Sequence, residues 1–308
     1  MNEKKTFSLQ ASGMIKKSSK SDLAGAAGDN NWTDLIDNFE DDYSFDLKME
    51  AFDITFGSNY QYKQTSTAVW NKSVGTVFRD YGTSWNIQFL NNYLKYKKKF
   101  SDRLSLSSTL YNRNTTVLPS TVYYVLDTAQ VGYYRPNNLT GIEEIVNYSP
   151  MDFLTITGGL TFEIEQLSKS ASLSVSSSPN EKPPKPETPE MLHNNLLSVF
   201  AEPRADLWGV ALVSAGVRFD HSSVYDDVFT PNIGLVVPFL AHRFRATYSE
   251  AFRAPKPWDY TDGIGNTSLK PEKANSFEAG LTFSFWDCFR FDASGFVSHI
   301  DDAIVKEM

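Results

Sequence analysis

Hydrophobic and polar residues alternate over several short stretches of this chain. From Phe277 to Phe285 every odd position is phenylalanine, alanine or leucine, and the even positions hold Glu278, Gly280, Thr282 and Ser284. Strict alternation is typical of a β-strand whose two faces meet different media. We therefore expect a strand here, with one face buried in an apolar medium.

The same alternation recurs upstream and predicts hairpins. Hydrophobic residues occupy odd positions from Tyr43 to Met49 and even positions from Phe52 to Phe56, so the phase slips by one residue with almost no spacer. Such a slip predicts a tight turn near Glu50 and Ala51. Further tight turns are expected at residues 97–102, 149–152, 203–207, 238–242 and 286–288.

The connections between these hairpins are long, polar and rich in Ser, Asn, Gly and Pro. They cover residues 63–82, 113–136, 167–194 and 251–275, and only the link at 221–228 is short. Loops beyond about 12–15 residues are uncommon in compact soluble domains. Outer-membrane barrels, in contrast, combine short periplasmic turns with long external loops. The pattern predicts an all-β fold, an antiparallel transmembrane β-barrel with hydrophobic faces toward lipid and polar faces toward a wet lumen.

The alternation also assigns a face to each strand. The predicted lipid-facing sets include Trp85, Ile87 and Phe89; Leu104, Leu106 and Leu110; Ile142, Val146 and Tyr148; and Leu154, Ile156, Leu160, Phe162 and Ile164. Aromatic residues near strand ends are expected to form belts at the membrane interfaces. These residues are Tyr43, Tyr60, Tyr62, Trp85, Tyr93, Tyr148 and Trp286.

Composition agrees with an all-β chain and excludes some partners. Among 308 residues, 14% are aromatic, supplied mainly by 22 Phe and 15 Tyr, which favours strands over helices. A net charge of -8 argues against nucleic acid as a partner. Cys288 is the only cysteine, so neither an internal disulfide nor a cysteine zinc site is expected. No stretch is apolar enough for a transmembrane helix, and the first residues lack the apolar core of a signal peptide.

Six segments of the second half, in order, resemble the barrel of TonB-dependent outer-membrane receptors. They are NNLLSVFAEP (194–203), AGVRFDHSS (215–223), FTPNIGLVVPF (229–239), YSEAFRAPKPWDY (248–260), GNTSLKPEKANSFEAGLTF (265–283) and DASGFVSHIDDAI (292–304). The match is strongest over residues 194–308, while before about Asn138 only the strand rhythm supports it. The resemblance implies a partial receptor barrel over residues 1–308.

The family's architecture is a barrel of 22 strands closed by an amino-terminal plug, which carries the segment that engages TonB. This sequence predicts about thirteen of the expected 22 strands, without plug, TonB-binding segment or signal peptide. We therefore expect a fragment of a receptor that transports nothing by itself. The partners that the resemblance implies are TonB, through a plug not present in this chain, a ferric-chelate or cobalamin-like ligand, and outer-membrane lipid.

Candidate sites are few, and none is catalytic. The four histidines lie apart, and no cofactor or metal site is expected, although the acidic run Glu40 to Asp42, with Asp34 and Asp37, resembles a cation-binding loop. The proline-rich segment 179–189 is expected to be an extended, exposed loop tip. The candidate ligand-binding residues at the extracellular mouth are Arg253, Trp258, Tyr260 and Lys270, because aromatic and cationic groups suit anionic chelates.

Three functions are compatible with these observations. The first is active uptake of a scarce nutrient, such as an iron-siderophore or cobalamin, through the outer membrane of a Gram-negative bacterium. The second is a passive porin or structural barrel, for which a charged lumen is equally suitable. The third is a secreted soluble β-protein, such as a carbohydrate-binding module or a hydrolase using paired carboxylates like Glu163 and Glu165. The first is preferred, and the chain is not expected to be an enzyme.

Overall fold

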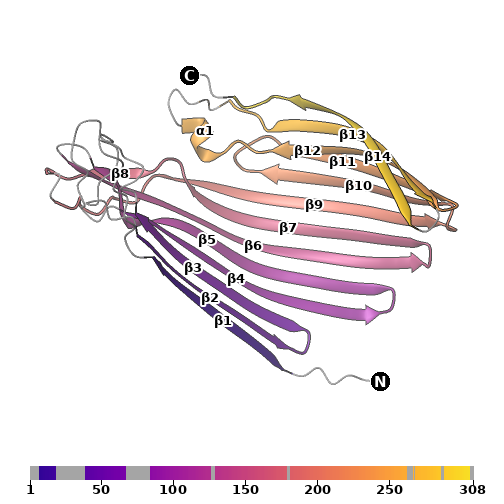
Figure 1. Ribbon diagram of the computed structural model, residues 1–308, viewed down its shortest axis with the longest axis horizontal. Helices are drawn as coiled ribbons and strands as arrows, with labels where there is room; N and C mark the ends of the chain where they lie inside the picture. The colour runs from indigo at the N-terminus through magenta and orange to yellow at the C-terminus, as the bar shows by residue number, and fades with distance from the viewer. Residues whose placement is uncertain are drawn as a thin grey trace. The chain divides into compact units, whose positions relative to one another are not determined.

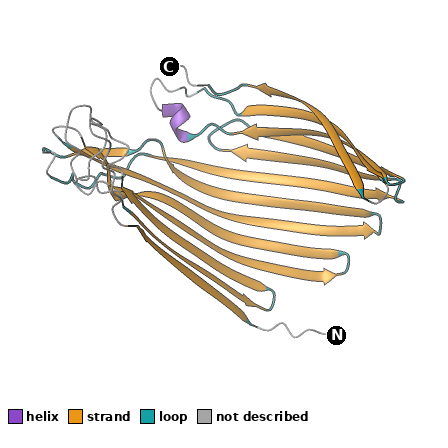
Figure 2. Ribbon diagram, in the orientation of Figure 1, coloured by secondary structure: helices purple, strands orange, loops and turns teal. Residues whose placement is uncertain are grey.

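A computed structural model describes residues 7–18, 39–66, 84–125, 129–178, 181–261, 266, 268–285 and 288–305. These residues form one 14-stranded sheet and a single short helix (Figures 1 and 2). The strands of the first half are β1 (Ser8–Ser18), β2 (Glu40–Ala51), β3 (Ile54–Ser66), β4 (Ser84–Ser101), β5 (Leu104–Val125), β6 (Gln130–Met151), β7 (Leu154–Ser168) and β8 (Ser172–Val175). The second half contains β9 (Met191–Leu207), β10 (Ala211–Ser222), β11 (Val228–Phe239), β12 (His242–Arg253), α1 (Pro257–Thr261), β13 (Glu272–Phe285) and β14 (Phe289–Asp301).

Each strand pairs with its neighbours in the sequence. The path runs in chain order from β1 to β14, and only β8 stands off it, as a partner of β6. The predicted all-β, antiparallel architecture is confirmed, and the predicted thirteen strands correspond to the thirteen of this path. Among the described residues no helix is long and apolar enough to cross a bilayer.

The chain divides into two compact units. Unit 1 contains Met1–Leu94, Tyr111–Thr140 and Glu165–His193, and unit 2 contains Lys95–Leu110, Gly141–Ile164 and Asn194–Met308. Unit 1 holds β1 to β3, β8 and the distal halves of β5 and β6. Unit 2 holds β10 to β14 with most of β9, and the candidate residues at the predicted mouth belong to it.

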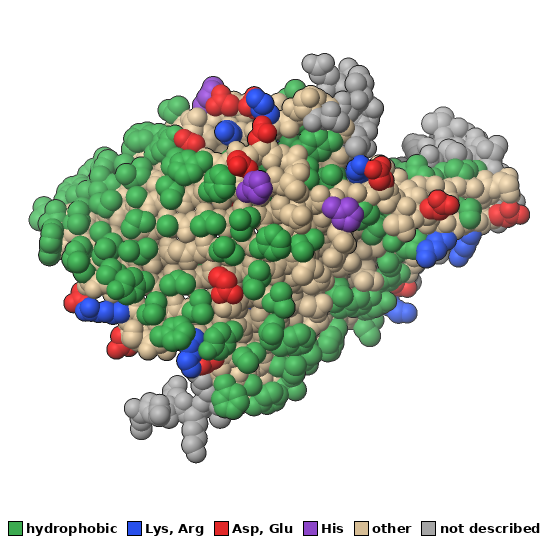
Figure 3. Space-filling model, turned by 180° about the vertical axis from the view of Figure 1, so that it is seen from behind, with side chains coloured by type: hydrophobic (Ala, Val, Ile, Leu, Met, Phe, Trp, Pro, Cys, Tyr) green, Lys and Arg blue, Asp and Glu red, His purple; other side chains and the backbone are tan. Residues whose placement is uncertain are grey.

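In unit 2 the register separates two chemically different faces. Leu281 lies opposite Phe244 on one side and Ala293 on the other, whereas Thr282 lies opposite Arg243 and Asp292. The hydrophobic side chains remain open to their surroundings: Phe277 is 53% exposed and Leu281 is 37% exposed. Hydrophobic side chains dominate the view of Figure 3, and most charged ones lie toward its margins. This sheet buries little of its apolar face against the described protein, as expected of a face that meets lipid.

Most tight turns lie one to a few residues beyond the predicted places. The first turn is Phe52–Asp53 rather than 50–51, because Ala51 still pairs with Ile54. The segment 203–207 is strand, and the turn follows at Trp208 to Val210. Phe52, Trp208 and Leu240 adopt positive φ angles of 54–55°, which turns ordinarily assign to Gly or Asn, and composition therefore failed to mark them.

The expected loop at 113–136 was wrong. β5 and β6 are 22 residues each and continue as a paired ribbon through most of that segment. The Thr, Val and Tyr residues of this segment have high β propensity, and their preference for strand outweighed the loop preference of its Asn and Pro residues. A transmembrane strand needs only about 9–11 residues, so the ribbon is long enough to continue well past a bilayer.

The face predicted for the start of β4 was also wrong. A side chain at Gly57 would collide with the Tyr93 ring, at 2.1 Å, so Gly57 and Tyr93 share a face, and Gly57 lies opposite Lys48. Trp85, Ile87 and Phe89 lie an even number of residues from Tyr93 along β4, so their side chains point to the same polar face. Trp85 there contacts Tyr133, with ring centroids 4.9 Å apart. A three-residue hydrophobic run was too short to distinguish an aromatic cluster on the polar face from a lipid face.

A small core of unit 1 forms where β8 and the proline-rich segment pack on β6. Val131 to Tyr134 pair with β8, and the Ser174 hydroxyl donates to the Pro184 carbonyl at 2.6 Å. A Cβ at Gly132 would lie 3.2 Å from Pro183 and 3.4 Å from Pro186. Pro186 is buried, so the expectation of an exposed tip fails for this part of the segment.

The acidic run is not a loop in the structure. Glu40 to Asp42 begin β2. Glu40 accepts a hydrogen bond from the Lys16 ammonium at 2.5 Å, and Asp42 accepts one from the backbone amide of Gln64 at 3.3 Å. Asp34 and Asp37 lie outside the described residues. Within the described residues no group of His, Cys, Asp and Glu side chains is arranged to hold a metal ion.

Candidate ligand-binding surface

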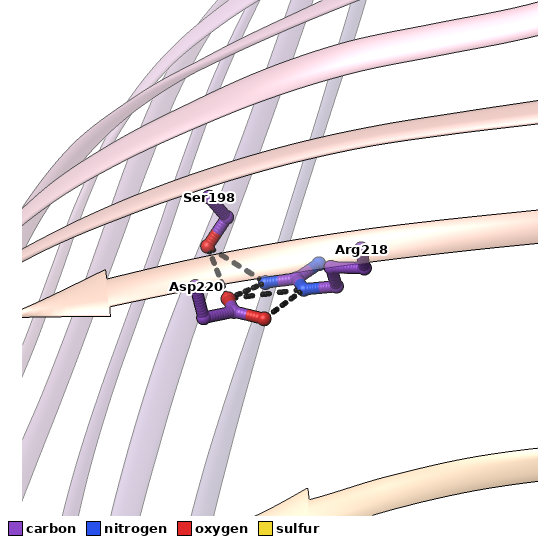
Figure 4. Close-up of polar contacts among 3 residues, drawn as sticks. All are labelled: Ser198, Arg218 and Asp220. Carbon is purple, nitrogen blue, oxygen red and sulfur yellow. Dashed lines mark hydrogen bonds and ion pairs between the residues drawn. The ribbon is translucent and has the colours of Figure 1, made fainter. Parts of the chain in front are cut away.

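The polar face of unit 2 carries a cluster of one arginine, one aspartate and one serine (Figure 4). Arg218 and Asp220 lie two residues apart on β10 and therefore share a face. Arg218 Nε donates to both Asp220 oxygens, at 3.0 and 2.9 Å, and Nη2 donates to Oδ1 at 2.8 Å. On β9, Ser198 lies opposite Asp220; its hydroxyl donates to Oδ1 at 2.5 Å and accepts from Nη2 at 2.9 Å.

Burial makes this cluster rigid. Asp220 and Ser198 are fully buried, whereas the Arg218 side chain is 43% exposed. A buried carboxylate requires a charged partner and well-formed hydrogen bonds, so Asp220 holds the guanidinium in one orientation. Glu163 of β7 also attracts Arg218 electrostatically. The exposed part of Arg218 is thus a preorganised cation on the polar face.

Two further arginine–carboxylate pairs lie on the same face. Arg245 donates to Glu278 at 3.3 Å, and Arg290 donates to Asp292 at 2.8 Å. A Cβ at Gly280 would lie 3.0 Å from the Arg245 guanidinium, so the glycine leaves room for this group to lie flat on the sheet. These pairs are more exposed than Arg218–Asp220, and ion pairs open to water add little to stability. Their role is to place several oriented cations on one surface.

The candidate mouth residues lie between β12 and β13. Arg253 ends β12 and forms an ion pair with Glu272, the first residue of β13, which also accepts the Ile304 amide at 2.6 Å. Glu272 thus balances the charge of Arg253 within this chain. Lys270 is exposed in the segment that enters β13.

The other two candidates belong to α1. Trp258 lies in this helix, and its side chain is outside the described residues. The Tyr260 hydroxyl is buried without a hydrogen-bond partner among the described residues. Burial, followed by the charges of Asp259 and Asp226, raises the pKa of Tyr260 above its usual range, and the phenol therefore remains a neutral donor.

Electrostatic contact links two of the four candidates. Asp259 interacts with both Arg253 and Tyr260. Within the part of the chain that the structure describes, no hydrogen bond or ring contact joins any two of the four. Their grouping as a ligand site stays a prediction.

The cluster around Arg218 was missed at the level of sequence, although its signal was present. In RFDH, Arg218 and Asp220 are separated by one hydrophobic residue, which places opposite charges side by side on one strand face. The contribution of Ser198 requires the pairing of β9 with β10, which the local pattern does not provide.

Comparison with known proteins agrees with this two-faced sheet. Residues 15–307 match the family model described as TonB dependent receptor-like, beta-barrel. The chain belongs to the TonB-dependent receptor family.

The relatives that this chain matches in sequence are named as vitamin B12 transporters. The chain is 24% identical over 322 residues to the vitamin B12 transporter BtuB of Vibrio vulnificus, covering 99% of this chain and 50% of the relative. A 99-residue part is 30% identical to BtuB of Vibrio cholerae, covering 32% of this chain and 16% of the relative. Over its full span, the chain therefore corresponds to about half the length of a relative.

Solved structures support the fold. The ferric enterobactin receptor PfeA of Pseudomonas aeruginosa superposes with a TM-score of 0.69 at 15% identity, covering 97% of this chain and 49% of PfeA. The copper transporter OprC superposes with a TM-score of 0.67 at 12% identity, covering 96% of this chain and 49% of OprC. At such identities the superpositions show that the barrel fold is shared, and they do not indicate which ligand this chain binds.

Proposed function

We propose that this chain is part of a receptor that actively imports a scarce nutrient, such as an iron-siderophore, cobalamin or a similar ligand. The receptor would lie in the outer membrane of a Gram-negative bacterium and be coupled to TonB through a plug outside this chain. It would bind and transport its ligand without changing it chemically. Membership of the family and the names of its relatives support this proposal.

The observation that carries the proposal is the row of oriented arginines on the polar face. Arg218, Arg245 and Arg290 are each held by a carboxylate, and Arg253 lies at the strand end near α1. Arginine binds planar anionic groups through paired N–H donors, and several cations on one surface attract anions from solution. An anionic chelate that enters at the mouth would meet Arg253, Trp258, Tyr260 and Lys270 first.

Ligand binding by the complete receptor tests the mouth residues. Arg253→Ala should weaken binding of an anionic ferric chelate by roughly 10-fold or more, because it removes a charged hydrogen-bond donor from the mouth. Tyr260→Phe should also weaken binding but leave folding unchanged, because it removes a buried hydroxyl that has no partner among the described residues. Titration of purified receptor in detergent measures both effects.

Arg103 provides the matched control. It forms an ion pair with Asp152 near the tight turns, at 3.1 Å, and its side chain is 58% exposed, against 47% for Arg253. Arg103→Ala should leave binding unchanged. Equal effects of Arg103→Ala and Arg253→Ala would contradict a binding site at the mouth.

Conductance and energy coupling distinguish the receptor from a passive porin. We expect the complete protein to be nearly silent in planar bilayers, and ligand uptake by cells to cease when TonB is removed. A steady open pore with TonB-independent uptake would identify a porin instead. A monomeric, cooperatively folded chain without detergent would contradict both membrane functions.

A further inference from the structure

Three arginines of unit 2 gather on its polar face near the tight turns. Arg243 and Arg245 lie two residues apart on β12 and therefore share a face, and Arg290 lies on β14. The strand between them, β13, pairs with both. Arg243 lies opposite Thr282 and Arg290 lies opposite Ser284, and these two residues of β13 also share the polar face. We call Arg243, Arg245 and Arg290 the arginine cluster.

Two members of the arginine cluster are held by carboxylates. Arg245 donates to Glu278 at 3.3 Å, and Arg290 donates to Asp292 at 2.8 Å. Arg245 also attracts Asp292 electrostatically. Two carboxylates thus compensate two of the three positive charges.

The third member, Arg243, has no such partner. Its side chain is exposed, and in the part of the chain that the structure describes it forms no ion pair or side-chain hydrogen bond. The residues directly opposite it are Pro238 on β11 and Thr282 on β13. Pro238 offers no side-chain acceptor, and the Thr282 hydroxyl is bonded to Asp292 at 2.5 Å. The cluster therefore carries one uncompensated positive charge.

The sheet beside Arg245 carries only small side chains. Arg245 lies opposite Gly280 on β13, which in turn lies opposite Ser294 on β14. A Cβ at Gly280 would lie 3.0 Å from the Arg245 guanidinium and 3.2 Å from the Ala293 carbonyl oxygen. The glycine thus keeps the surface low where the Arg245 guanidinium lies, and the group remains 38% exposed.

The spacing of the three arginines suits a ligand with more than one anionic group. Two residues along β12 separate the backbones of Arg243 and Arg245 by about 7 Å, and β13 separates β12 from β14 by about 10 Å in total. Long arginine side chains cover such distances. Guanidinium groups bind carboxylate and phosphate oxygens through paired N–H donors. An anion with two charged groups can therefore contact two members of the cluster, whereas a single charged group contacts one.

We propose that the arginine cluster binds oligoanions, that is, small molecules with two or more carboxylate or phosphate groups. Arg243 supplies the uncompensated charge, and Arg245 and Arg290 share their donors between the bound anion and their own carboxylates. Arg253 lies ten residues further along β12, about 33 Å along the strand, so the site is separate from the mouth. Its use as a second stop for an imported ligand rests on the proposed function.

Arginine footprinting of the purified complete receptor in detergent tests the site. Phenylglyoxal modifies accessible guanidinium groups, and peptide mass spectrometry gives the rate of modification at each arginine. The probe is inorganic tripolyphosphate, compared with sodium chloride at equal ionic strength so that general screening is the same. At twice its Kd, tripolyphosphate should slow the modification of Arg243 roughly 3-fold, since the free fraction of the site falls as 1 + [L]/Kd. Inorganic phosphate at the same concentration should slow it less.

Arg204 is the matched control. It is an exposed arginine of the same polar face, on β9, opposite Ser214 and three strands away from β12. Tripolyphosphate should leave its modification unchanged. Arg245→Gln should reduce the protection of Arg243, whereas Arg204→Gln should not, and the heat-modifiable mobility of each variant reports that the barrel is folded. Equal slowing at Arg204 and Arg243, no slowing at Arg243, or equal protection by phosphate and tripolyphosphate would overturn the oligoanion site.

The footprint and the proposed function fail separately. If Arg243 is not protected but Arg253→Ala still weakens binding of the ferric chelate, the arginine cluster is not a site and the proposed function stands. If Arg243 is protected by tripolyphosphate but the receptor binds no anionic chelate, the site stands and the proposed uptake is wrong.

Discussion

At Leu281 and Thr282, two neighbouring side chains of β13 meet opposite surroundings. Leu281 is 37% exposed on the hydrophobic face, whereas the Thr282 hydroxyl donates to Asp292 at 2.5 Å on the polar face. We expect Leu281→Arg to cost roughly 2–4 kcal/mol, as measured for arginine near the midplane of a lipid face. Thr282→Arg should cost much less, because it places a cation beside the Asp292 carboxylate.

The measurement is the amount of folded, outer-membrane-assembled receptor for each variant. Leu281→Arg should lower it far more than Thr282→Arg. Equal tolerance of the two arginines would show that the faces of β13 are assigned wrongly. A protease site at Asn266 and Thr267 should be cut from outside intact cells if this connection is external; Thr267 itself lies outside the described residues.

At the scale of elements, β8 and the proline-rich segment depend on the absence of a side chain at Gly132. A Cβ there would lie 2.5 Å from Ser174 Oγ and close to the rings of Pro183 and Pro186. Proline rings have few conformations with which to relieve such a contact. Gly132→Val should therefore displace the segment from β6 at a cost of about 1–3 kcal/mol, typical of overpacking.

Limited proteolysis with a glutamate-specific protease reports this displacement. Cleavage after Glu187 should accelerate in Gly132→Val, because Pro186 is no longer held in its buried place. Gly295→Val is the matched control, since no atom lies within 4 Å of a Cβ at that position. Unchanged cleavage at Glu187 in Gly132→Val would argue that the segment does not dock on β6 in solution.

At the scale of the whole molecule, the parity of the strand path restricts how the sheet is completed. The path has thirteen strands with β8 set aside, and its first and last strands run in the same direction because neighbours are antiparallel. Pairing β14 directly with β1 would be parallel, whereas transmembrane barrels are antiparallel with an even number of strands. Antiparallel closure therefore requires an odd number of additional strands.

Co-expression with complementary pieces tests this requirement. A partner piece that supplies an odd number of strands should restore a protease-resistant, heat-modifiable barrel in outer-membrane fractions. A piece shortened by one strand should leave an unpaired edge, which hydrocarbon does not tolerate. Equal assembly with odd and even pieces would show that the path closes in another way.

The alternation of residues by itself determined the strand architecture and most faces of this protein, because side-chain direction in a strand depends only on local parity. It predicted the all-β fold, the hairpins and the two faces of β13. It failed for turns whose positive φ angles fall on Phe52, Trp208 and Leu240, and for the polar ribbon of β5 and β6, where pairing outweighed composition.

Only the tertiary structure decided which side chains meet across strands. Ser198 joins Arg218 and Asp220 through the register of β9 with β10, and Ser108 meets Glu144 through the pairing of β5 with β6. The partners are 20 to 36 residues apart in the sequence, and no local pattern encodes their register. The face of Trp85 was likewise settled by the close approach of Tyr93 to Gly57. The alternation within one strand separates its residues into two faces, but it does not show which face meets lipid and which meets water.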